Sequence, residues 1–114
     1  MNMKSLLPPS ILSKAFEFNS ELAWKPEDVS ELAFILKEKQ IAVLGGEVWQ
    51  KKGDAPTIGS DVYHWSSTQK NNNEAWDDYV DRTLSEMNNF VKGLPNEIVL
   101  NKDTYINIEM TRQC

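Results

Sequence analysis

Chemically reactive side chains are scarce in this sequence, which has one cysteine and one histidine in 114 residues. Because Cys114 is the only cysteine, the chain cannot form an intrachain disulfide, and we expect a reducing compartment. No apolar run approaches the roughly 20 residues that a membrane-spanning helix requires, and the first residues lack the apolar stretch of a signal peptide. We therefore expect a cytoplasmic protein without a membrane partner, folded as one domain over residues 1–114.

Basic side chains are also in the minority, with 12 Lys and Arg against 17 Asp and Glu and a net charge of −5. A protein that binds nucleic acid normally neutralises phosphates with a basic face. The only local concentrations of lysine are Lys37 with Lys39 and Lys51 with Lys52. The composition thus argues against nucleic acid as a partner and favours a basic protein partner.

Hydrophobic periodicity predicts up to three helices. A short helix is expected over 8–17, with proline at its start, where a missing N–H does no harm. A stronger helix is expected over 26–39, with an apolar stripe that Phe34 widens. The clearest helix covers 73–92, and Gly93 is placed for the left-handed residue that often ends a helix.

Strand signals occur between and after these helices, over 41–44, 47–51, 62–65 and 104–111. In the last of these segments apolar and polar residues alternate, as expected of a sheet with one covered face. This order of elements predicts an α+β fold, a single domain with two to three helices packed on a mostly antiparallel sheet.

Two adjacent glycines, Gly45 and Gly46, raise the question of a phosphate-binding loop. A P-loop requires a following Gly-Lys-Ser/Thr, and a dinucleotide fingerprint requires a third glycine and a helix. Here Glu47, whose charge would repel phosphate, and the strand formers Val48 and Trp49 follow. We interpret the pair as a bulge, a bend or a close backbone contact in a strand, and we expect no cofactor.

A catalytic site would have to be built around His64, which lies between aromatic residues. A histidine-dependent site needs an acid such as Asp61 to orient the ring and a serine within reach. Three serines lie nearby in the sequence, Ser60, Ser66 and Ser67. Adjacent residues of a strand point to opposite faces, so we favour a surface or half-buried histidine without a catalytic role. A small hydrolase that uses His64 and nearby acids is the alternative.

Three acids, Asp77, Asp78 and Asp81, lie close together in the long predicted helix. Grouped carboxylates bind Mg²⁺ or Ca²⁺, usually when several elements supply ligands. No Asp-x-Asp-x-Asp-Gly loop occurs, so we interpret the group as a solvated helix face that favours the helix dipole, and we expect no metal. A metal-dependent enzyme that uses these acids is the second form of the catalytic alternative.

Recognition of a partner is a further use of the charged and aromatic residues. Trp24 and Trp76 are expected in the core. Trp49 and Trp65 lie on predicted strands, where a core position is favoured and a position in an interface remains open. Two acidic helices and these strands supply ten candidate partner-binding residues: Glu27, Asp28, Glu31, Glu47, Trp49, Tyr63, Trp65, Asp77, Asp78 and Asp81.

Four stretches follow one another along nearly the whole chain: LPPSILSKAF, ELAWKPEDVSELAFILKEKQIAVLGGEVW, PTIGSDVYHW and EAWDDYVDRTLSEMNNFV. Their order is similar to that of the immunity protein 40 family, small bacterial proteins encoded beside polymorphic or contact-dependent toxins. The resemblance implies an α+β protein that binds and neutralises a cognate toxin in the cytosol, and it implies no catalytic residues. We expect a basic toxin, such as a nuclease domain. A small enzyme and a structural or chaperone-like adaptor are the alternatives.

Overall fold

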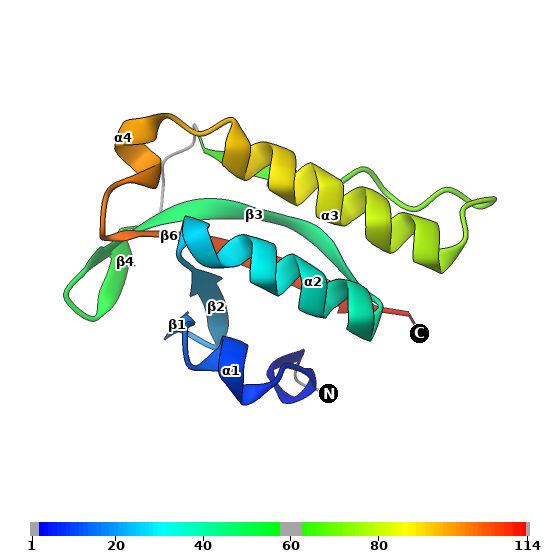
Figure 1. Cartoon of the computed structure of the whole chain (residues 1–114), viewed down its shortest axis with the longest axis horizontal. Coiled ribbons are helices and arrows are strands. Elements are labelled where there is room, and N and C mark those ends of the chain that lie inside the picture. The colour runs from blue at the N-terminus through cyan, green and yellow to red at the C-terminus, as the bar shows by residue number, and fades with distance from the viewer. Residues whose placement is uncertain (1–2, 58–62, 114) are drawn as a thin grey trace.

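A computed structural model describes residues 3–57 and 63–113 of the chain (Figure 1). These described residues contain two long helices, four short ones and six strands. In chain order the elements are η1 (Met3–Leu6), α1 (Pro9–Leu12), β1 (Phe16–Phe18), β2 (Glu21–Trp24), η2 (Pro26–Asp28), α2 (Val29–Lys39), β3 (Ile41–Lys52), β4 (Ala55–Thr57), β5 (His64–Ser66), α3 (Trp76–Lys92), α4 (Asn96–Val99) and β6 (Thr104–Arg112).

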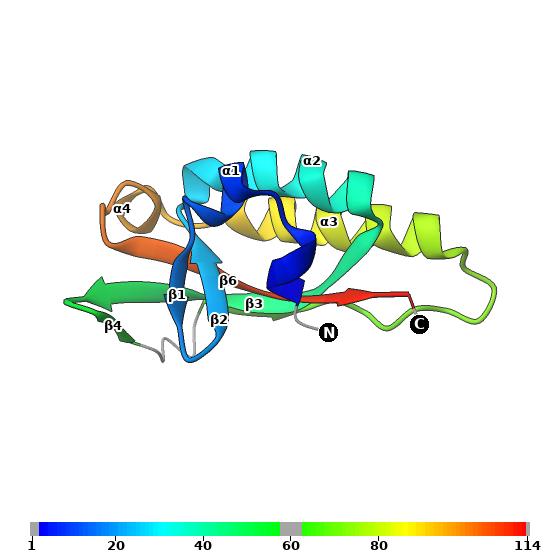
Figure 2. The ribbon, with the colours of Figure 1, turned by 90° about the horizontal axis from the view of Figure 1, so that it is seen from below.

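The strands form one antiparallel sheet in the order β1-β2-β6-β3-β4, and β5 also pairs with β3. The long pairing of β3 with β6, from Ile41–Arg112 to Gln50–Thr104, is the centre of the sheet. Helices α2 and α3 lie side by side over one face of it (Figure 2). The predicted α+β class with helices on a mostly antiparallel sheet is therefore confirmed.

The main core lies between these two helices and the sheet. Each helix places an apolar stripe on the sheet at helical spacing, and burial of one such aliphatic side chain is worth about 1.5–3 kcal/mol. Trp24 is fully buried, as predicted, and its indole N–H donates to the Ile11 carbonyl at 2.9 Å. The other buried contributors include Val29, Leu32, Leu36, Ile41, Val43, Val80, Leu84, Met87, Ile106 and Ile108.

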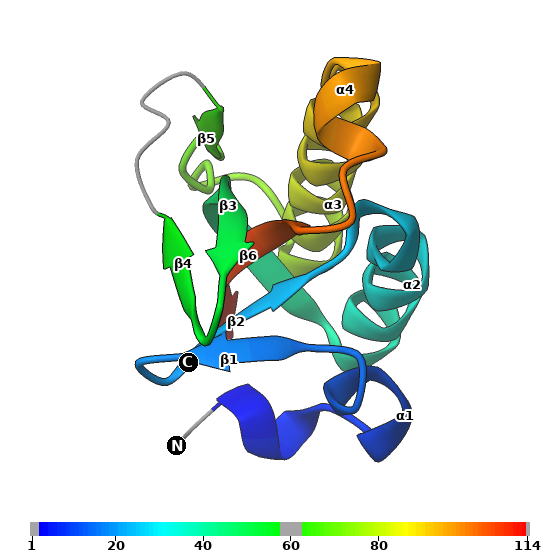
Figure 3. The same ribbon diagram turned by 90° about the vertical axis from the view of Figure 1, so that its left-hand side faces the viewer.

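A second, smaller apolar cluster forms on the face of the sheet away from the helices. The sheet is strongly twisted, so that β1 and β2 run at a steep angle to β3 and β4 (Figure 3). Phe16 of β1 thereby contacts Trp49 edge-on, with ring centroids 6.0 Å apart, and lies 5.3 Å from the Tyr105 ring. Lys51 lies over the Phe16 ring, 5.0 Å from its centroid. Trp49 is completely buried by this cluster.

The two glycines bend β3, as the sequence predicts. The register of β3 against β6 shifts between Val43 and Gly45, and Gly45 has φ of 155°, which L side chains rarely adopt. A Cβ on Gly46 would lie 2.1 Å from the Asn107 carbonyl oxygen and 2.6 Å from the ring of Trp65. Glycine is therefore required here for a bulge and for two close approaches.

The bend leaves backbone groups of β3 outside the regular ladder, and neighbouring elements satisfy them. The Val43 N–H donates to the hydroxyl of Thr83 in α3 at 3.0 Å, while this hydroxyl donates to the Val80 carbonyl. The Leu44 carbonyl accepts from the Ser67 N–H at 2.8 Å. Thr83 is fully buried within the apolar stripe of α3, so its hydroxyl fixes where the helix crosses the bend.

Two helix predictions are wrong in detail. The helix expected over 8–17 ends at Leu12, and the chain enters β1 at Phe16 because that ring packs on Trp49 and Tyr105. Gly93 follows α3 but has φ of −81°, so it is not the left-handed residue that was expected. Of the strand predicted over 62–65, Val62 lies outside the described residues, and β5 covers His64–Ser66.

We expect Gly46→Ala to lower the free energy of unfolding by about 3 kcal/mol, because its methyl group would collide with the Asn107 carbonyl and the Trp65 ring. Gly93→Ala is a matched control. Its Cβ would meet nothing closer than 3.4 Å, and φ there suits alanine, so its stability should change by less than about 1 kcal/mol. Urea unfolding followed by tryptophan fluorescence measures both, and equal stabilities would contradict the assigned close approach.

Candidate functional site

The acids of η2 and α2 lie on the outer side of the helix layer, where a lysine from the N-terminal segment joins two of them. Lys14 donates to the Glu31 carboxylate at 2.6 Å and lies 3.9 Å from Asp28. The hydrogen bond to Glu31 raises the pKa of Lys14. Glu27 is exposed beside this pair. The carboxylates are thus held in place at the surface and are partly neutralised.

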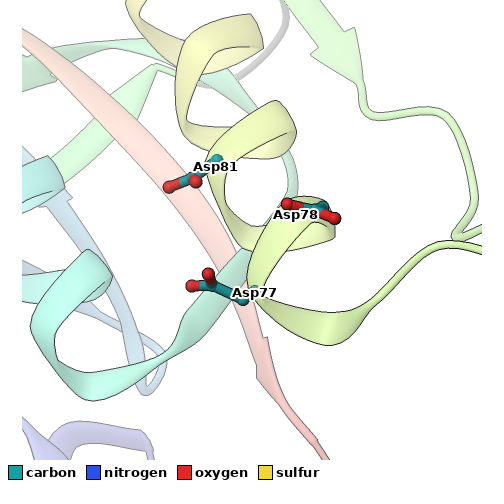
Figure 4. Close-up of side chains that lie close together, drawn as sticks. All are labelled: Asp77, Asp78 and Asp81. Carbon is teal, nitrogen blue, oxygen red and sulfur yellow. The ribbon is translucent and has the colours of Figure 1, made fainter.

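The acids of α3 gather at the beginning of that helix. Asp77, Asp78 and Asp81 are exposed, and their carboxylates lie within 4.8 Å of one another (Figure 4). Lys37 of α2 contacts both Asp77 and Asp81, the latter at 2.8 Å. Its hydrogen bond is the main cause that lowers the pKa of Asp77, and the two carboxylates raise the pKa of Lys37. An ammonium group therefore occupies the position between two of the three acids, where a cation would be coordinated.

Phe34 lies on the exposed side of α2, which corrects its expected position in the core stripe. Its side chain is 68% exposed. It follows the fully buried Leu32 by two residues, or about 200° around the helix axis. Glu31 and Glu38 precede and follow it at helical spacing, and both are exposed.

Phe34, the glutamates beside it in α2 and the aspartates of α3 form one continuous surface. Lys37, three residues after Phe34, joins α2 to these aspartates. Sequence reasoning missed the aromatic residue at the centre of this surface, although the helical angle from Leu32 identifies it. We call this surface the Phe34 face. It consists of Glu31, Phe34, Lys37, Glu38, Asp77, Asp78 and Asp81.

The remaining candidate residues lie elsewhere. Glu47 accepts a hydrogen bond from the Trp49 indole at 3.1 Å, on the sheet face away from the helices. Trp49 has no exposed surface, so it cannot contact a partner directly in this structure. Of the two positions considered for it, core and interface, the structure shows the buried one. Tyr63 is half-buried, and the half-buried Trp65 ring stacks on Phe90 with centroids 4.4 Å apart. The ten candidates therefore do not form a single surface.

A shallow groove of about 270 Å³ lies on the open sheet face beside Gly45 and Gly46. Glu21, Glu47, His64 and Glu109 contribute its charged and titratable side chains. His64 is exposed and, within the described residues, its side chain makes no hydrogen bond or ion pair. The companions first considered for it, Asp61 and Ser60, lie outside those residues, as does Cys114. Within the described residues, the side chain of His64 therefore has no hydrogen-bonded acid or serine to orient it.

Arg82 fixes the loop that leads into α3, a role the sequence did not reveal. Its guanidinium donates to both carboxylate oxygens of Glu74, at 2.9 and 3.0 Å, and to the carbonyls of Thr68 and Gln69. The pKa of Glu74 is lowered mainly by this hydrogen bonding. Such a bidentate contact suits arginine alone. It holds the loop before α3 against the helix, close to the aspartates of the first turns.

Comparison with known proteins identifies the family of the chain. A family model matches residues 12–110, which include the Phe34 face, and it places the chain among immunity proteins. The chain belongs to the immunity protein 40 family. Searches of curated proteins and of solved structures give no significant match. Among the described residues, no helix is both long and apolar enough to cross a membrane.

We expect Lys37→Gln to raise the pKa of Asp77 toward its ordinary value, because the variant lacks the ammonium group that stabilises the carboxylate. A carbon-detected NMR titration of the carboxyl groups measures this shift. In the parent protein the contact stabilises the fold above the ordinary carboxyl pKa and is lost as the pH falls through the lowered pKa. The variant should therefore lose less stability than the parent on acidification.

Lys39→Gln is the control for this titration. Lys39 is exposed on the same helix and makes no ion pair within the described residues. The Lys39→Gln variant should leave the titration of Asp77 unchanged. If Lys37→Gln also leaves it unchanged, the contact with Lys37 is not the cause of the lowered pKa.

Proposed function

We propose that this immunity protein binds a cognate toxin domain through the Phe34 face and neutralises it by occlusion, without catalysing a reaction. The single observation that carries the proposal is the 68% exposure of Phe34 among carboxylates. An aromatic side chain that remains exposed on a helix gains little in the free protein, whereas burial in a partner's pocket makes it an anchor. Membership of an immunity protein family supports a toxin as that partner.

The charge around Phe34 favours a basic toxin, such as a nuclease domain. Asp77 and Asp81 share Lys37, and Glu31 is paired with Lys14, so these acids are held at fixed positions. Glu38 and Asp78 make no ion pair within the described residues. Unpaired surface carboxylates accelerate the approach of a basic protein, and ordered ones orient it.

The helix side is a better candidate than the groove on the open sheet face, although both carry acids. The groove contains Glu21, Glu47 and Glu109, but its principal exposed apolar side chain is Leu44, which is 42% exposed. Trp65, the aromatic residue that lines the groove, is half-buried, because its ring stacks on Phe90 and covers Gly46. An interface needs a desolvated anchor as well as charge, and Phe34 provides one on the helix side.

Neutralisation by binding requires no catalytic role of His64, whereas the catalytic alternative depends on that residue. The exposed imidazole has no hydrogen-bonded acid or hydroxyl within the described residues. A base that is not oriented by a third group is poorly placed to activate a nucleophile. We propose that the protein acts in the cytoplasm, where it covers the toxin before the toxin reaches its substrate.

Phe34→Ala should weaken binding to the toxin domain encoded beside this protein by at least about 2 kcal/mol, roughly thirtyfold in Kd, because the variant loses its central anchor. Stability should change little, since the side chain is 68% exposed in the free protein. Isothermal titration calorimetry measures the affinity, and urea unfolding measures the stability.

Leu100→Ala is the matched control, because Leu100 is also a large exposed apolar residue, at 81%, but lies outside the Phe34 face. It should bind the toxin as tightly as the parent. Equal affinity of Phe34→Ala and the parent would exclude the Phe34 face as the anchor. A toxin that binds neither the parent nor the variants would instead count against that toxin as the partner.

Reversal of the two unpaired acids, with Glu38→Lys and Asp78→Lys, should slow association by about tenfold at low salt and flatten its dependence on ionic strength. The dissociation rate should change much less. Stopped-flow association at several salt concentrations measures both effects. The expected partner in this experiment is the same adjacent toxin domain.

The control is a double charge reversal on the open sheet face, Glu21→Lys with Glu109→Lys. It changes the net charge by the same amount as Glu38→Lys with Asp78→Lys, but on the side of the sheet away from the helices. It should slow association less than the helix-face pair does. The opposite ranking would move the proposed interface to the groove beside Gly45 and Gly46.

A further inference from the structure

Helix α3 leads into α4 at one end of the molecule (Figure 1). Residues of this region and of η2 line a second recess. It has a volume of about 570 Å³. Its apolar lining comes from segments that are far apart in the sequence: Pro26, Val91, Leu94, Val99 and Leu100. We call this recess the α3–α4 groove. A smaller depression of about 210 Å³ shares Pro26, Val91 and Lys92, so the groove continues between the start of α2 and the end of α3.

The charge around this groove is opposite to that of the whole protein. Lys25, Lys92 and Lys102 line it, with Glu27 as the one acid. Within the described residues none of these three lysines forms an ion pair with a carboxylate. A chain with net charge −5 thus places three lysines without an ion pair to any described carboxylate around one apolar recess. That arrangement complements a ligand with both carboxylates and aliphatic side chains.

Leu100 gives the groove an exposed contact residue. Its side chain is 81% exposed, the highest value among the large apolar side chains identified as exposed, and it lies directly after α4. Leu94, in contrast, is buried and belongs to the main core, so the floor of the groove is rigid. An exposed leucine over an apolar floor is typical of a surface that is covered when a partner binds.

We propose that the α3–α4 groove binds an acidic amphipathic protein segment, whose aliphatic side chains cover Leu100 and Val91 and whose carboxylates pair with Lys92 and Lys102. A basic segment would meet three unpaired lysines. An anionic membrane would repel a chain with net charge −5. This surface is distinct from the Phe34 face, and the proposal does not depend on toxin binding there.

A synthetic helical peptide with leucines on one side and glutamates on the other tests the proposal, with the full chain labelled with nitrogen-15. We expect saturable shifts of the amide signals of the groove residues. A peptide with lysine in place of each glutamate should cause none of these shifts. The double variant Lys92→Glu and Lys102→Glu should bind the acidic peptide about tenfold more weakly, as expected for the loss and reversal of two exposed ion pairs.

Two controls separate this groove from general charge effects and from the Phe34 face. Lys39→Glu with Lys52→Glu makes the same charge change at exposed lysines outside the groove, and it should leave the affinity within about twofold. Phe34→Ala should also bind the peptide normally, whereas Leu100→Ser should weaken it. The proposal is overturned if the acidic peptide does not bind, if the lysine peptide binds equally well, or if the groove variants bind like the parent.

Discussion

The bend of β3 at Gly45 and Gly46 is the constraint on which the arrangement of the surfaces depends. Where the strand bends, its backbone approaches Asn107 of β6 so closely that no side chain fits between them. The ring of Trp65 covers Gly46 and stacks on Phe90, while Thr83 satisfies the freed N–H of Val43. Two points along α3 are therefore tied to one short stretch of β3. The position of α3 then determines where its acids and its C-terminal lysine lie.

Much of the architecture depends on local patterns and was accessible from the sequence. The helices over 29–39 and 76–92, the strand over 104–112 and the glycine bend each follow from periodicity or from residue type within a few positions. Phe34 does not belong to the predicted apolar stripe, because it lies about 200° from Leu32 around the helix axis and is exposed. That angle is geometry that the sequence does contain.

The remaining features of the fold and of the surfaces depend on contacts between segments that are distant in the sequence. Trp49 is buried because the twist of the sheet brings Phe16 and Tyr105 against it, and no pattern near position 49 contains that information. The α3–α4 groove unites residues 25–27 with residues 91–104, so its lysines are scattered in the sequence and adjacent only in the fold. The same holds for Lys37 and Asp77, whose ion pair joins α2 to α3. Such juxtapositions depend on tertiary packing.

The charges of α3 are divided between its two ends, in the sense that favours the helix dipole. Asp77 and Asp78 lie in the first turn and Lys92 in the last, about 23 Å away at 1.5 Å per residue. An interface of standard size covers about 800 Å² on each partner, which is a circular patch of about 16 Å radius. Two such patches overlap when their centres lie about 23 Å apart, so partners of standard size at the Phe34 face and at the α3–α4 groove would compete for the surface between them. Glu27 lines the groove and also belongs to the acidic series that begins α2, so two such partners would approach one another there.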